Sequence, residues 1–128
     1  MGNYFKFTLQ SINMTIDHSN WTYNEFLAFL LVYAAEMNYP LSKEELEFIR
    51  SRTQIVDILK IKATVDSVSD MEAIDIIEEY RKKYLDSKEK EVQAKTDLEN
   101  LLKTPGIHSQ LEKAGVHILE KILVTRTG

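Results

Sequence analysis

Oxygen-bearing side chains at two predicted turns are the residues of this chain that could hold a metal ion. Glu36, Asn38, Glu44 and Glu45 surround the first turn, and Glu112 follows the second. Carboxylate and amide oxygens are the ligands that Ca²⁺ and Mg²⁺ prefer. However, Glu45 and Glu112 also stand where a helix-capping acid belongs, and the chain has no EF-hand loop pattern. Glu36, Asn38, Glu45 and Glu112 are therefore the candidate ligands, but we expect no metal ion to bind.

The three histidines do not have the spacing of a zinc site. His108 and His117 are nine positions apart, and His18 lies far from both in the chain. A zinc-binding helix places two histidines four positions apart, as in the HExxH motif, which is absent here. We expect surface or boundary histidines.

Acid–base catalysis and nucleic-acid binding are also not expected. Asp75, Glu78 and Glu79 could act as paired carboxylates, but they share a predicted helix with the basic run 81–83, and such mixed charges are typical of a solvated face. That run is the longest basic one and is flanked by acids. No phosphate-binding glycine loop or nucleophile elbow is present. The sequence therefore predicts neither an enzyme nor a cofactor site.

Composition indicates one soluble domain. The chain has 128 residues, 44% of them apolar and 28% charged, with no cysteine and a net charge of −4. A chain of this size can bury a substantial core without disulfides or metals. The excess of acid gives nothing to neutralise phosphates, so nucleic acid is not an expected partner. The longest apolar run, Phe26–Ala35, is too short to span a bilayer, and no signal-peptide core is visible, so we expect a cytoplasmic protein without membrane insertion.

Helix starts are marked by four capping boxes, in which a hydroxyl residue is followed three positions later by glutamate. They are Thr22/Glu25, Ser42/Glu45, Ser69/Glu72 and Ser109/Glu112. Together with apolar spacing they predict helices over about 22–37, 43–52, 54–63, 70–85, 86–100 and 110–124, with a connector over 64–68. The first should be the central helix, because apolar residues occupy most of its faces. The first twenty residues fit an extended arm or a short hairpin.

The expected buried faces follow from helical spacing. Ile55, Ile58, Leu59 and Lys62 share one face of the third helix. Helix 86–100 should be exposed except for a narrow seam of Val92, Ala94 and Leu98, and the last helix should bury Leu111, Ala114, Ile118 and Ile122, with Gly115 allowing close approach of a neighbouring backbone. The aromatic residues with helical spacing should be core: Tyr23, Phe29, Tyr33, Phe48, Tyr80 and Tyr84.

An internal repeat relates the two ends of the chain. A shift of 67 positions places 38–45 over 105–112, so that both copies consist of a helix, a tight turn, a capping box and a helix. The same shift pairs Leu31 with Leu98 and Ile55 with Ile122. Two helix–turn–helix units, about 22–63 and 86–124, would explain the pattern. We therefore predict an all-α, single-domain antiparallel bundle of about five to seven helices over 21–128, preceded by an arm over 1–20.

The segment 29–45, FLLVYAAEMNYPLSKEE, resembles the first signature of the TerB-like (tellurite-resistance) helical family, and 101–119 resembles a degenerate second one. The resemblance implies an all-helical bacterial domain associated with stress or tellurite resistance, sometimes with metal binding, and no enzymatic reaction. The family usually carries aspartate in both turns, whereas this chain has Asn38–Tyr39 and Pro105–Gly106. Loss of those aspartates removes the anionic oxygens that a divalent cation needs.

The sequence thus favours a non-enzymatic module that acts through a protein partner or a second copy of itself. The alternative is a divalent-metal sensor that uses the turn around Asn38. A sensor needs several acidic oxygens at one point, whereas an interaction module needs a contiguous apolar patch and no buried acids.

Overall fold

The computed structural model describes residues 20–37, 40–104 and 110–123, and for 110–114 the backbone alone. These residues form six α-helices and no strand, which confirms the predicted single-domain helical bundle. The helices are α2 (Tyr23–Ala35), α3 (Lys43–Thr53), α4 (Ile58–Ser67), α5 (Asp70–Tyr84), α6 (Lys88–Leu102) and α7 (Gln110–Leu123). The predicted arm lies outside the described residues, except for its last position.

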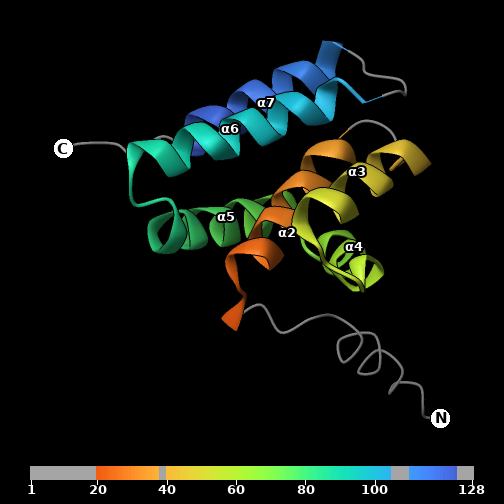
Figure 1. The fold of residues 1–128 in the computed structure, drawn as a ribbon, viewed down its shortest axis with the longest axis horizontal. Helices are drawn as coiled ribbons and strands as arrows, with labels where there is room; N and C mark the ends of the chain where they lie inside the picture. The colour runs from red at the N-terminus through yellow and green to blue at the C-terminus, as the bar shows by residue number, and fades with distance from the viewer. Residues whose placement is uncertain (1–19, 38–39, 105–109, 124–128) are drawn as a thin grey trace.

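Helix α2 is the central element, as its composition predicts. It contacts each of the other five described helices. Figure 1 shows α6 and α7 side by side along one edge, with α2 between this pair and α4. Nine of its thirteen residues are buried, and the half-buried exceptions include Tyr23 and Tyr33. An apolar helix surrounded in this way loses water on nearly every face, so it supplies much of the hydrophobic stabilisation.

Three of the four predicted capping boxes are present. Thr22, Ser42 and Ser69 each accept from the backbone N–H three residues later, and the matching glutamates accept from the cap N–H groups. The distances lie between 2.8 and 3.2 Å. Each box satisfies two backbone donors that a helix start leaves without an intrahelical partner. The fourth predicted box, at Ser109, lies outside the described residues.

The third predicted helix was placed too early. It begins at Ile58, not near Gln54, and it continues through the predicted connector to Ser67. Gln54 ends α3 in the left-handed conformation, with φ of 61°, so the chain cannot continue as a helix there. Thr64 donates its hydroxyl to the carbonyl of Lys60 (3.0 Å) and Val65 is buried, so packing outweighs the weak helix propensity of both residues.

Several predicted buried positions are exposed. Leu59 and Val92 face solvent, and Ile118 is 59% exposed. In α6 the buried face consists of Glu91, Ala94, Asp97, Leu98 and Leu101, and in α7 the buried apolar residues are Val116, Leu119 and Leu123. The predicted seam of α6 is correct at Ala94 and Leu98 and wrong at Val92, and it did not include the buried acids Glu91 and Asp97. The side chains of Leu111 and Ala114 lie outside the described residues.

An aromatic cluster holds the start of α2 against α5. The ring of Trp21 stacks on Tyr80, with centroids 5.5 Å apart, and Tyr80 is nearly parallel to Tyr84. The backbone N–H of Trp21 donates to the hydroxyl of Tyr80 (2.9 Å), and the hydroxyl of Tyr84 donates to the carbonyl of Trp21 (2.6 Å). Offset aromatic contacts add to the burial of this large apolar area. The six aromatic residues predicted as core are all buried or half-buried.

Candidate functional site

The main candidate site is a cleft of about 490 Å³ that is open to solvent. It is lined by the end of α2, the end of α4, the start of α5 and the middle of α7. Its acidic residues are Glu36, Asp66 and Asp70, and its apolar residues include Met37, Val68, Ile74 and Ile118. Clefts of this volume, mostly apolar with a few polar groups, are typical of binding sites.

Local sequence explains why these helix ends meet at the cleft. Glu36 is the C-terminal cap of α2, and Val68, in an extended conformation, caps α4. Ser69 then starts α5 at once through its capping box with Glu72. The C-termini of α2 and α4 and the N-terminus of α5 therefore lie at the cleft. Neither α2 nor α4 has a basic residue in its last turn.

A network of two acids and one lysine joins α2 to α4. Lys62 Nζ donates to Asp66 Oδ2 (2.7 Å) and lies 3.2 Å from Glu36 Oε2. The side chain of Glu36 is 15% exposed, and its Oε1 is buried and accepts no hydrogen bond from the described residues. In its protonated form, Glu36 can instead donate to Asp66.

This network separates the pKa values of its two acids. Burial raises the pKa of Glu36, and the hydrogen bond to Asp66 raises it further, outweighing the attraction of Lys62. Burial also acts to raise the pKa of Asp66, but the hydrogen bonds from Lys62 and Glu36 prevail and lower it. The hydrogen bond to Asp66 raises the pKa of Lys62. Of the two acids, Glu36 is therefore the one that takes up a proton first as pH falls.

Tyr33 and Asp70 connect α2 to α5 on the same cleft. The hydroxyl of Tyr33 donates to Asp70 Oδ1 at 2.9 Å. Burial, and then the hydrogen bond to Asp70, raise the pKa of Tyr33 to about 12. Tyr33 is thus a neutral hydrogen-bond donor at physiological pH.

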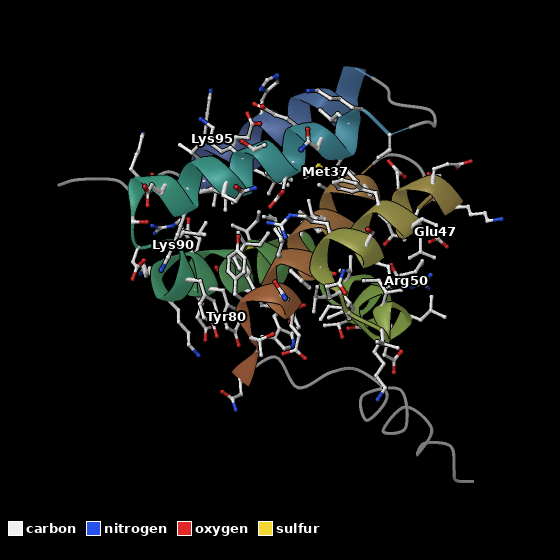
Figure 2. All side chains as sticks on the ribbon, viewed as in Figure 1. Met37, Glu47, Arg50, Tyr80, Lys90 and Lys95 are labelled. Carbon is white, nitrogen blue, oxygen red and sulfur yellow. The ribbon has the colours of Figure 1, made fainter. Side chains whose placement is uncertain are left out.

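Gly115 brings α7 close to the end of α2. A Cβ atom at this position would overlap the sulfur of Met37, which is labelled in Figure 2. The prediction that Gly115 allows a close approach concerned a neighbouring backbone, but the group that approaches is this methionine side chain. The contact places Ile118, one helical turn further along α7, at the margin of the cleft.

Of the four predicted metal ligands, the structure describes the side chains of Glu36 and Glu45 and gives them different surroundings. Glu36 lines the cleft, but Glu45 is buried in the capping box of α3, and Glu44 is exposed. Asn38 and the side chain of Glu112 lie outside the described residues. Among the described side chains, no three acids or histidines could hold a metal ion together, and this includes the three acids of the cleft.

The other described candidates do not line the cleft. Asp75 and Glu79 are exposed, and Glu78 pairs with Arg81 at 3.4 Å. His117 is exposed, with its Nδ1 3.3 Å from Glu120 Oε1. His18 and His108 lie outside the described residues.

Sequence reasoning missed a buried ion pair between α3 and α6. Arg52 Nε donates to Asp97 Oδ1 at 2.8 Å, and Gln93 Nε2 donates to the same oxygen at 3.2 Å. Asp97 is 2% exposed. The one sequence signal for a buried acid was the position of Asp97, at helical spacing from Ala94 and Leu101. Nothing in the sequence identified Arg52 as its partner.

The fold is a small all-α helical bundle, and its open cleft is lined by acidic and apolar residues. Comparisons with protein-family models, with curated proteins and with solved structures find no match for this chain. No helix in the described ranges has the length and apolar character needed to cross a membrane.

Proposed function

We propose that this protein is a non-catalytic interaction module and that the cleft between α2, α4, α5 and α7 is its binding surface. The observation that carries the proposal is the exposure of Ile118 at the margin of a cleft with an apolar lining. Exposed apolar side chains beside a concave, polar-edged surface are typical of protein-binding sites. The candidate catalytic acids support the non-catalytic part, because they lie along one helix with Glu78 paired to a cation.

The resemblance to TerB-like proteins adds a biological setting to this proposal. In that setting the module serves a bacterial stress or tellurite-resistance system in the cytoplasm. Deletion of its gene should then increase the sensitivity of the cell to tellurite. Unchanged growth on tellurite would contradict the setting without bearing on the cleft.

Site-specific photo-crosslinking in the native cell tests the binding surface. A photoreactive residue replaces Ile118 in one variant and Val92 of α6 in the control variant, because Val92 is similarly exposed at 49% and does not line the cleft. We expect discrete adducts from position 118 and none from position 92. Equal adducts from both, or none from position 118, would refute the proposal. An adduct of twice the mass of the chain would identify a second copy as the partner.

A further inference from the structure

The charges around the cleft describe the partner that fits it, given the proposed function. Among the described residues, all three charged side chains that line the cleft are acids. Lys62 is the one cation that pairs with Glu36 and Asp66 among the described residues, and Asp70 accepts from the neutral hydroxyl of Tyr33. The cleft therefore has more negative than positive charge.

Helix dipoles add to this negative charge. The C-termini of α2 and α4 both end at the cleft, where the last carbonyl groups concentrate partial negative charge. Proteins commonly place lysine, arginine or histidine there, but the last turns of both helices have none. Glu36 instead places a carboxylate at the negative end of α2. The start of α5 brings partial positive charge, which its own Asp70 and Glu72 offset.

One carboxylate oxygen of Glu36 accepts no hydrogen bond from the described residues. This oxygen, Oε1, is buried, whereas Glu36 Oε2 is paired with Lys62. A buried carboxylate oxygen without a donor is costly, and a cationic donor satisfies it best. A guanidinium or ammonium group that enters the cleft would offset the negative charge of Glu36 and of both helix ends.

The apolar part of the cleft limits which cations fit. Ile118 is 59% exposed, and Met37, Val68 and Ile74 are half-buried. A small hydrated cation would leave these side chains in water. A peptide segment with both apolar and cationic side chains would cover them and reach the acids at once.

We propose that the cleft binds a basic amphipathic segment of a partner protein, and that an arginine of this segment pairs with Glu36 and Asp66 beside Lys62. Arginine suits this place better than lysine, because its planar group donates to two carboxylates and is more weakly hydrated. Apolar side chains of the segment, one helical turn from the arginine, then cover Ile118 and Ile74.

Selection from a random peptide library on the full chain tests this inference. The library is selected against the wild type, against a Glu36→Gln, Asp66→Asn double variant, and against an Asp75→Asn, Glu79→Gln control. The control removes the same formal charge from the exposed face of α5, outside the cleft. We expect peptides rich in arginine and apolar residues from the wild type and the control, but not from the cleft variant. Circular dichroism melts check that all three proteins are folded.

A selected peptide then tests the role of its arginine directly. Citrulline replaces this arginine, which keeps the shape of the side chain and removes its charge. We expect about a tenfold loss of affinity for the wild type, the effect of one charge-assisted hydrogen bond, and no loss for the cleft variant. Equal affinity of the wild type for both peptides would overturn the inference.

The other outcomes separate the inference from the proposed function. Enrichment of neutral or acidic apolar peptides at the cleft would overturn the inference and leave the interaction module standing. Failure to enrich any peptide, together with no adduct at position 118, would overturn both. Two results would give the cleft a different occupant and overturn the inference: spermine binding as tightly as the peptides, or a dimer that the cleft variant abolishes.

Discussion

Replacement of Arg52 by alanine removes the cation that balances the buried carboxylate of Asp97. In the folded protein Asp97 is 2% exposed and keeps only the hydrogen bond from Gln93 once the arginine is gone. In the unfolded chain the same carboxylate is fully hydrated. The Arg52→Ala variant therefore buries an anion without its counterion, which lowers the free energy of unfolding.

The size of this effect follows from the exposure of the two side chains. Loss of one partner from a fully buried ion pair costs about 3–5 kcal/mol. The Arg52 side chain is 32% exposed, so water can reach part of the place that it leaves, and we expect about 2–3 kcal/mol. For a chain of this length that corresponds to a fall of roughly 10 °C in melting temperature.

Arg50 provides a matched control on the same helix. Its pair with Glu47 is 3.3 Å long and both side chains are exposed. Figure 2 labels the two residues on α3. Exposed pairs of this kind contribute about 0–1 kcal/mol, so Arg50→Ala should cost less than about 0.5 kcal/mol. Urea unfolding followed by circular dichroism measures both variants.

The result that refutes the reasoning is a small effect at Arg52. If Arg52→Ala costs no more than Arg50→Ala, the buried pair does not stabilise the contact between α3 and α6. A double-mutant cycle gives a second check. Asp97→Ala should cost less in the Arg52→Ala background than in the wild type, because the charge that it removes is already unbalanced.

Three further predictions concern the cleft, the caps and metal binding. The pKa of Glu36 is raised in the folded protein, so protonated Glu36 favours folding. This contribution to the free energy of unfolding is complete below the ordinary pKa of 4.5 and is lost as pH rises through the pKa of the folded state. Glu36→Gln should therefore gain stability relative to the wild type between pH 4 and pH 7 in urea titrations, and a relative loss would contradict this. Ser69→Ala should lower the free energy of unfolding by about 1 kcal/mol, because it removes the cap of α5. The control Ser51→Ala, on the exposed surface of α3, should change it by less than about 0.5 kcal/mol. Equal effects would mean that the capping box of α5 adds no stability. After chelator treatment, Ca²⁺, Mg²⁺, Mn²⁺ and Zn²⁺ should leave the melting temperature unchanged; binding at a hundred times the dissociation constant would add about 2.7 kcal/mol, so a saturable shift would support a metal sensor.

The candidate site was only partly predictable. Glu36 was recognised as a chemically capable residue, but its partners were sought in the neighbouring turn and not in α4. Its actual partners, Lys62 and Asp66, lie in a segment where the sequence indicated a different helix boundary. That boundary depends on Gln54 adopting a positive φ, which residues other than glycine rarely do.

The internal repeat stays a prediction. Its two copies correspond to the α2–α3 and α6–α7 regions, and the members of each pair are in contact. The turn of the second copy lies outside the described residues. Residues 105–109 would have to show the same capping geometry as Ser42 and Glu45 for the repeat to hold.

What the sequence determined by itself was local. Helix class, the central place of α2 and the three observed capping boxes depend on residues within three or four positions of one another, or on average apolar content. The tertiary structure alone decided which faces of α6 and α7 are buried and which charges meet. A carboxylate such as Asp97 is stable in the core only beside Arg52, which lies 45 positions away. The cleft likewise exists only because four helices that are separate in the chain converge there, and spacing within any one of them carries no information about that convergence.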